Sequence, residues 1–76
     1  MFFVDLVDIQ TMAELCFELQ EYDIYLVMSV YFWDDELRVH ITNGDISMNT
    51  KDMSPTEICH RLEEMLIEKG GEKNES

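Results

Sequence analysis

The sequence contains few of the residues on which disulfide-rich, phosphate-binding and nucleic-acid-binding proteins depend. Its 76 residues include one proline, three glycines, two cysteines and five lysines or arginines. Two cysteines are too few to build a disulfide framework. The glycines form no phosphate-binding loop, because Gly44 lies between two apolar runs and Gly70-Gly71 lies near the end of the sequence. With so little positive charge, the chain is not expected to bind nucleic acid directly.

Long apolar runs are missing as well. No stretch approaches the roughly 20 apolar residues that cross a bilayer, so no membrane association is expected. The stretch Met1–Asp5 reaches an acidic residue without a basic residue before it, which argues against a signal peptide. Cys16 and Cys59 both fall on apolar helix faces, which is typical of buried thiols in a reducing compartment. We therefore expect a cytoplasmic location.

Acidic residues dominate the charge of the chain. Seventeen aspartates and glutamates against five basic residues give a formal net charge of −12. Spread over the roughly 4,900 Å² of surface expected at this mass, that charge repels nucleic acid and anionic membranes and attracts basic partners. Apolar residues still make up 46% of the chain, so it is expected to fold. The length allows one small α+β domain over residues 1–70, followed by a polar tail over 71–76 that is expected to be disordered.

The first helix is predicted to begin near residue 11. Thr11-Met12-Ala13-Glu14 fits a capping box, in which the hydroxyl and the carboxylate each accept a hydrogen bond from a free amide, and Asp8 is an alternative cap. Apolar and acidic residues then recur at helical spacing as far as Tyr22-Asp23, where the helix should end. Residues 2–7 are interpreted as a short N-terminal strand, with an extra helical turn as the alternative.

Three strands joined by two tight turns are predicted in the middle of the chain. They cover residues 24–33, 36–42 and 45–49, which are rich in β-branched and aromatic residues. Asp34-Asp35 and Asn43-Gly44 are the predicted turns, and Asn-Gly is a strong hairpin signal because a type I′ turn needs positive φ at both positions. The expected apolar pairs are Phe32 with Leu37, Val30 with Val39 and Met28 with Ile41 across the first turn, and Ile41 with Ile46 and Val39 with Met48 across the second. Both turns place these apolar side chains on the same face of the sheet.

The last helix has clear start and stop signals. Ser54 is the expected N-cap, Pro55 occupies the first helical position, and Glu57 lies three residues after the cap. Lys69-Gly70 supplies a basic last turn and a glycine stop. The expected fold is therefore α+β in the order α-β-β-β-α, a three-stranded antiparallel meander with both helices packed on its apolar face.

That order of elements is also the order found in double-stranded RNA-binding domains. Those domains bind the phosphates of RNA through basic residues. Here the second helix instead carries Glu57, Glu63, Glu64 and Glu68. The activity of those domains is therefore not expected in this chain.

The face of the sheet turned away from the helices is predicted to be a partner-binding surface. It should carry Tyr25, Tyr31 and Trp33, with Arg38 directly opposite Tyr31. Exposed aromatic residues beside an arginine have the composition of interface hot spots. The alternative is that the aromatic residues only satisfy β-propensity or are covered by another segment.

Two groups of carboxylates form a second candidate surface. Glu14, Glu18 and Glu21 are spaced i, i+4 and i+7, so neighbours lie roughly 5–6 Å apart along the helix axis. Asp34, Asp35 and Glu36 crowd the first hairpin turn. Such rows could replace the phosphates of a nucleic acid in the basic groove of an enzyme. The alternative is an ordinary solvated surface.

No catalytic, cofactor-binding or metal-binding residues are predicted. His60 has helical spacing to Glu63 and Glu64, and Cys59 is its neighbour, but no second pair of ligands accompanies them. Two histidines and many carboxylates do not by themselves give an oriented base and nucleophile in a cleft. We therefore expect no enzyme activity and no cofactor.

The function that remains is protein binding. In size, charge and lack of catalytic residues the chain is similar to small inhibitors encoded by phages and mobile elements, among them anti-CRISPR and DNA-mimic proteins. That resemblance implies a cytoplasmic inhibitor that blocks the nucleic-acid site of a basic enzyme. The alternative is a homodimeric structural or adaptor protein that associates through its edge strand and the aromatic outer face.

Overall fold

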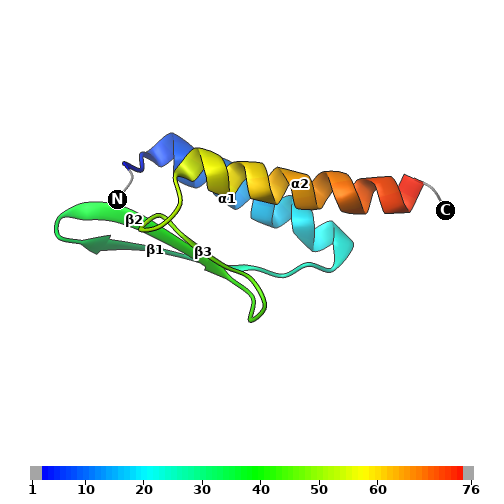
Figure 1. Cartoon of the computed structure of the whole chain (residues 1–76), viewed down its shortest axis with the longest axis horizontal. Coiled ribbons are helices and arrows are strands. Elements are labelled where there is room, and N and C mark those ends of the chain that lie inside the picture. Colours follow the sequence, from blue (N-terminus) through cyan, green and yellow to red (C-terminus); the bar gives the residue numbers. More distant parts are fainter. Residues whose placement is uncertain (1–2, 75–76) are drawn as a thin grey trace.

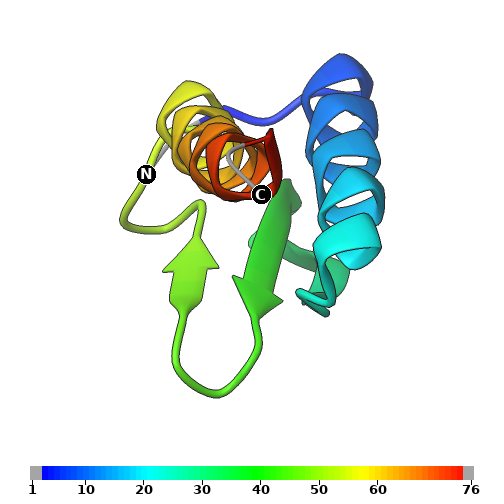
Figure 2. The ribbon, with the colours of Figure 1, turned by 90° about the vertical axis from the view of Figure 1, so that its right-hand side faces the viewer.

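A sheet of three antiparallel strands lies against two helices in the computed structural model, which describes residues 3–74 (Figure 1). The elements are α1 (Leu6–Leu19), a 3₁₀ turn η1 (Gln20–Tyr22), β1 (Val27–Trp33), β2 (Glu36–Thr42), β3 (Ser47–Asn49) and α2 (Pro55–Asn74). In the end-on view of Figure 2, α1 and α2 lie side by side on the same side of the sheet. The predicted order and the α+β class are confirmed.

Helix α1 begins earlier than predicted. Asp5 is its N-cap, and the Asp5 carboxylate accepts a hydrogen bond from the Asp8 amide at 2.9 Å while the Asp8 carboxylate accepts one from the Asp5 amide at 3.1 Å. Two aspartates thus form the capping box, since aspartate caps a helix as well as threonine does. Thr11 lies inside the helix, where its hydroxyl donates to the Val7 carbonyl oxygen at 3.0 Å.

The predicted N-terminal strand is wrong where the structure describes it. Residues 3–5 have no strand pairing, residues 6 and 7 belong to α1, and Phe2 lies outside the described residues. The capping box explains the difference, because it satisfies the free amides of a helix start at Asp5. The predicted end of the helix is confirmed, since η1 stops at Tyr22 and Asp23 adopts a left-handed φ of 62°.

The first hairpin has the predicted register. Its pairs include Met28 with Ile41, Val30 with Val39 and Phe32 with Leu37. Asp34 and Asp35 both have positive φ, 52° and 62°, as a type I′ turn requires. The turn therefore fixes the pairing of the whole length of β1 with β2.

The second hairpin is shifted by two residues from the predicted register. Ile41 pairs with Met48, not with Ile46, because the turn is centred on Gly44 and Asp45. The Asn43 amide donates to the Ile46 carbonyl oxygen at 3.1 Å, and Gly44 alone of the two central residues has positive φ, 97°. A type II′ turn needs glycine at its first central position, so Gly44 decides the register here. A shift of two residues keeps each side chain on its predicted face.

Helix α2 begins at its predicted cap and ends later than predicted. The Ser54 hydroxyl accepts a hydrogen bond from the Glu57 amide at 3.1 Å, as an N-cap should. The helix continues through Gly70 to Asn74, so the predicted stop is wrong, and the predicted tail is helical as far as residue 74. Glycine ends a helix when it adopts positive φ, and Gly70 does not. Residues 75 and 76 lie outside the described residues.

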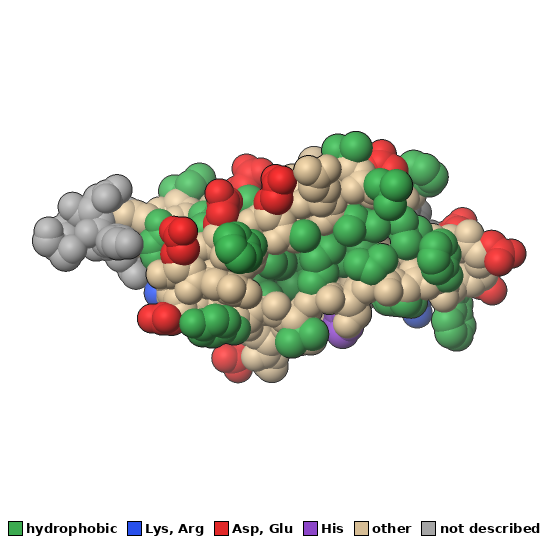
Figure 3. Space-filling view, turned by 180° about the vertical axis from the view of Figure 1, so that it is seen from behind, with side chains coloured by type: hydrophobic (Ala, Val, Ile, Leu, Met, Phe, Trp, Pro, Cys, Tyr) green, Lys and Arg blue, Asp and Glu red, His purple; other side chains and the backbone are tan. Residues whose placement is uncertain are grey.

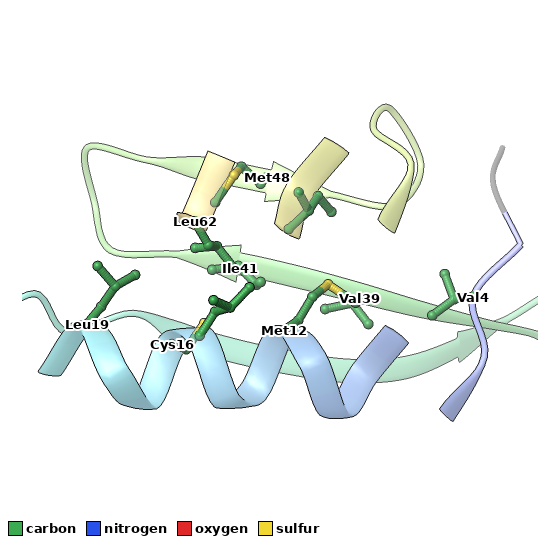
Figure 4. Close-up of a cluster of buried hydrophobic side chains, with 10 residues drawn as sticks. Val4, Met12, Cys16, Leu19, Val39, Ile41, Met48 and Leu62 are labelled. Atoms are coloured by element: carbon green, nitrogen blue, oxygen red, sulfur yellow. The ribbon is translucent and has the colours of Figure 1, made fainter. Parts of the chain in front are cut away.

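The buried core lies between the helices and the two strands β2 and β3. Figure 4 shows side chains of α1 pointing toward Val39 and Ile41 of β2. The buried apolar residues are Val4, Met12, Leu15, Cys16, Leu19, Val39, Ile41, Met48, Ile58 and Leu62. None of the described residues of β1 belongs to this set. Val30 and Phe32 of β1, predicted to face the core, are 47% and 74% exposed, because the helices do not cover this edge of the sheet.

Candidate functional site

Three carboxylates predicted to bind a partner meet on the outer surface of α1 and η1. Glu14, Glu18 and Glu21 are exposed and line one shallow depression of about 630 Å³ together with Ala13 and Phe17. Their spacing places them on one side of the helix, opposite the buried residues. We call this surface the acidic depression. Within the described part of the chain, no lysine or arginine forms an ion pair with any of the three carboxylates.

The acidic depression combines apolar and acidic chemistry. Phe17 lines the depression and is 71% exposed, so its ring offers apolar surface beside the carboxylates. A lysine or arginine side chain has the matching structure, an apolar stem with a charged end. The stem can lie on the ring while the charged end meets Glu14, Glu18 or Glu21, and an aromatic ring adds a cation–π attraction. The depression is therefore suited to a basic side chain of a partner.

The second group of carboxylates forms a separate surface. Asp34, Asp35 and Glu36 are exposed at the turn between β1 and β2. In Figure 1 this turn lies toward the end of the molecule where α1 begins, whereas η1 lies toward the other end. Glu36 Oε2 is 3.8 Å from the Arg38 guanidinium. The six predicted carboxylates thus form two separate groups, and those of Glu14, Glu18 and Glu21 line the acidic depression.

The outer face of the sheet exposes its aromatic residues but not its arginine. Tyr31 and Trp33 are exposed, and Tyr31 lies directly opposite Arg38 in the sheet. Tyr25 is exposed too, but β1 begins at Val27 and not at residue 24 as predicted, so Tyr25 lies before the strand and outside the sheet. Arg38 is only 7% exposed. The Arg38 guanidinium therefore packs within the protein beside Glu36 and is not accessible to a partner.

An apolar surface that the sequence analysis missed lies along α1 and β1. All residues of β1 except Met28 are exposed, including Val30 and Phe32 on the side of the helices. Leu6 and Phe17 are exposed on α1 and share one stripe of that helix. We call the four exposed residues Leu6, Phe17, Val30 and Phe32 the apolar band. Figure 3, which views the molecule from behind, shows that hydrophobic side chains gather on this face of the molecule.

The apolar band lies on the flank of α1 turned away from α2. The opposite flank carries Asp8 and Thr11, which line a depression of about 330 Å³ with Thr56, Cys59, His60 and Glu63 of α2. Since α2 covers that flank, the stripe of Leu6 and Phe17 stays open. No described element covers β1 on this side.

Exposed aromatic side chains lie on both faces of the sheet. On the side of the helices Phe17 and Phe32 are 71% and 74% exposed, and on the outer face Tyr31 and Trp33 are 39% and 61% exposed. At about 200 Å² for each side chain, these fractions leave about 290 Å² of aromatic surface on the first side and about 200 Å² on the second. Each area is smaller than the roughly 800 Å² that one partner buries in a standard interface.

One sequence signal could have revealed this surface. The run from Ile24 to Trp33 is apolar at almost every position, without the alternation of a strand that has one face in solvent. Such a run is typical of a strand that is covered on both faces. Here Ile24, Leu26 and Met28 pack half-buried against the core, whereas Val30 and Phe32, which continue the same alternation, are exposed. The predicted pairing alone could not show that.

The two thiols lie where the helices pack together. Cys16 is buried on α1 and Cys59 is half-buried on α2, and both are free. Burial raises the pKa of both thiols, and each has a further contribution, from Cys59 on Cys16 and from Asp8 and Glu63 on Cys59. Low thiolate character makes both cysteines poor nucleophiles.

The raised thiol pKa values predict a loss of stability at high pH. The folded protein holds the thiol protons more tightly than the unfolded chain does, because the thiol pKa is raised on folding. The stabilisation that this gives the folded state is complete below the ordinary thiol pKa of 9.0 and is lost as the pH rises above that value. The free energy of unfolding should therefore fall with pH in that range, as measured by urea titration. The Cys16→Ala variant should show a shallower fall, and an identical pH profile would contradict the prediction.

Other chemistry has little support among the described residues. His60 Nε2 is 2.9 Å from Glu64 Oε1, so the imidazole pairs along its own helix. In residues 3–70 no group of three or more histidine, cysteine, aspartate or glutamate side chains is arranged to hold a metal ion. None of the described helices is long and apolar enough to cross a bilayer.

Comparisons with protein-family models, curated proteins and solved structures found no match to the chain. The surfaces themselves, above all the acidic depression and the apolar band, are thus the basis for assigning a function.

Proposed function

We propose that this protein is a non-enzymatic binding module that recognises the basic surface of another protein. The observation that carries the proposal is the acidic depression, where three carboxylates and an exposed ring surround one hollow. None of the described basic residues neutralises them. The net charge of −12 supports it further, because such a field speeds association with a basic partner.

The spacing of Glu14, Glu18 and Glu21 is not explained by the stability of α1. Glu14 and Glu18 are like charges at i, i+4, which destabilise a helix by a few tenths of a kcal/mol. Gln10 Nε2 donates to Glu14 Oε1 at 3.3 Å, which neutralises no charge. A lysine or arginine from a partner would remove the repulsion, so binding and relief of the repulsion would reinforce each other.

The more specific proposal is nucleic-acid mimicry. Carboxylates spaced along a helix can occupy the positions of successive phosphates in the basic groove of a nucleic-acid enzyme. The protein would then act as a competitive inhibitor, as a phage or mobile-element inhibitor of the anti-CRISPR kind does. The free thiols of Cys16 and Cys59 support action in a reducing compartment such as the cytoplasm.

The test compares two triple variants with the same change in charge. Glu14→Gln, Glu18→Gln and Glu21→Gln together should weaken capture of basic nucleic-acid enzymes by at least about tenfold. The control neutralises Glu57, Glu63 and Glu68, exposed carboxylates of α2, and should change capture little. Retained proteins are identified by mass spectrometry with the immobilised protein as bait.

Two further measurements separate the specific proposal from the general one. Capture should fall steeply between about 50 and 200 mM salt, as phosphate binding does. Duplex DNA added as competitor should release the partner if the site is the nucleic-acid groove. Equal losses in both triple variants would mean that only net charge matters, and no loss in either would overturn the proposal.

A further inference from the structure

The outer edge of β1 carries backbone groups without a partner among the described residues. The strand order is β1-β2-β3, so β1 pairs only with β2. Trp33 and Glu36 flank the two-residue turn and form a hydrogen-bonded pair, and such pairs alternate along an antiparallel ladder. The N–H and C=O groups of Met28, Val30 and Phe32 therefore point away from β2 toward solvent.

This edge lacks the features that usually prevent strands from pairing with other chains. Natural edge strands are short, bulged, or carry lysine or proline. β1 has seven residues with no charged residue and no proline, and its pairing with β2 runs unbroken from Val27 to Trp33. Apart from Met28, its side chains are exposed on both faces. An unprotected edge of this length is a template for an added strand.

We propose that β1 binds an extended segment of a protein partner by strand addition, and that this segment is apolar in its centre and basic at its ends. The inference rests on the proposed function, because the partner is the same basic protein. Backbone hydrogen bonds to Met28, Val30 and Phe32 would give the affinity. The apolar centre would pack beside Val30 and Phe32 on one face and beside Tyr31 and Trp33 on the other.

Charges at both ends of β1 specify the basic ends of the segment. Asp34 and Asp35 directly follow the strand, Asp23 lies four residues before it, and all three carboxylates are exposed. A segment paired along the full length of β1 would place one end close to Asp34 and Asp35, and its other end would reach Asp23 by extending past residues 24–26. Lysine or arginine at those ends is complementary, whereas aspartate or glutamate is repelled.

The same charges disfavour a second copy of this chain as the occupant. Two β1 strands paired antiparallel about Val30 would place Asp34 and Asp35 of each copy beside residues 25 and 26 of the other, close to Asp23. Each copy also carries a net charge of −12. A basic segment gains from the carboxylates that a second copy would repel.

The probe for the experiment is a synthetic peptide of alternating valine and tyrosine with two lysines at each end. Binding should slow hydrogen exchange at the amides of Met28, Val30 and Phe32 by at least about tenfold, as added hydrogen bonds do. A peptide with the same sequence and every amide of its valine and tyrosine residues N-methylated has no N–H group on either edge of its centre, and it should give no protection. Replacing its lysines with glutamates should abolish binding.

Variants of β1 test the edge itself. Val30→Pro removes an outward amide and leaves the bonds to β2 intact, because proline is tolerated where the N–H faces solvent. It should weaken peptide binding by at least about tenfold. Val30→Lys keeps the amide, repels the lysines of the peptide and should also weaken binding. Ile67→Lys makes the same kind of change at an exposed site on α2 and should have no effect.

The outcomes separate this inference from the proposed function. Strand addition is overturned if the peptide binds without protecting the β1 amides, or if both Val30 variants bind it normally. It is also overturned if light scattering finds a dimer whose β1 amides are protected without peptide. In each case the triple variant of Glu14, Glu18 and Glu21 still tests the acidic depression on its own.

Discussion

Replacing Leu62 with alanine should remove most of the stability of the folded protein. Leu62 lies on α2, is fully buried, and points into the space above Ile41 and near Met48 (Figure 4). A buried Leu→Ala change costs about 2–5 kcal/mol through lost apolar burial and the cavity that remains. A domain of this size has only about 5 kcal/mol to lose. Urea unfolding followed by circular dichroism should show a midpoint near zero denaturant.

The matched control is another apolar residue of the same helix. Ile67 is 74% exposed, so Ile67→Ala removes a similar side chain without a cavity. Its free energy of unfolding should stay within about 0.5 kcal/mol of the original. If Leu62→Ala behaves like Ile67→Ala, α2 does not pack on the sheet as described.

Replacing Thr50 with valine should destabilise the protein by about 1–3 kcal/mol, because it leaves a buried amide without an acceptor. The Thr50 hydroxyl accepts a hydrogen bond from the Val39 amide at 3.0 Å, and the Thr50 amide donates to the Val39 carbonyl oxygen at 3.0 Å. Both residues are almost fully buried. Valine has nearly the shape of threonine, so the change removes the acceptor and keeps the packing.

Thr50→Ser is the control for this interaction. Serine keeps the hydroxyl and loses a methyl group, so it should retain the hydrogen bond to Val39. Hydrogen exchange at the Val39 amide, measured beside urea unfolding, should accelerate in the valine variant and much less in the serine variant. Equal exchange rates in the two variants would show that the hydroxyl is not the acceptor of this amide.

These two predictions concern Leu62 and Thr50, which lie in the buried part of the molecule. The buried apolar residues come from α1, α2, β2 and β3, together with Val4. β1 adds a ladder of hydrogen bonds and a row of exposed apolar side chains. Retaining so much apolar surface at an edge risks aggregation in a solitary domain. A partner that covers β1 would remove that risk, which is consistent with strand addition.

The candidate sites were predictable to different degrees. The row of Glu14, Glu18 and Glu21 follows from helical spacing alone, and the structure gathers these residues around one depression. The exposure of Tyr31 and Trp33 follows from strand alternation. The burial of Arg38 does not, because it depends on how neighbouring residues pack on the sheet.

Local sequence determined the kinds of elements and most of their ends. The first hairpin register follows from a turn of two residues, and the cap of α2 follows from Ser54. Two predictions were wrong where local signals compete: the cap of α1 is Asp5 and not Thr11 or Asp8, and the second turn is Gly44-Asp45 and not Asn43-Gly44. Alternative caps and turns differ by only about 1 kcal/mol, so the local sequence does not decide between them. The acidic surface was also determined locally, since charged side chains stay in solvent whatever the packing.

Only the tertiary structure decided which apolar faces are covered. Val30 and Val39 are partners in adjacent strands with the same side chain, yet Val39 is fully buried and Val30 is 47% exposed. The difference arises because α1 and α2 pack against each other above β2 and β3, so the core forms there and β1 remains at its margin. Burial depends on contacts between residues far apart in the chain. The apolar band and the free edge of β1 are therefore properties of the packed molecule.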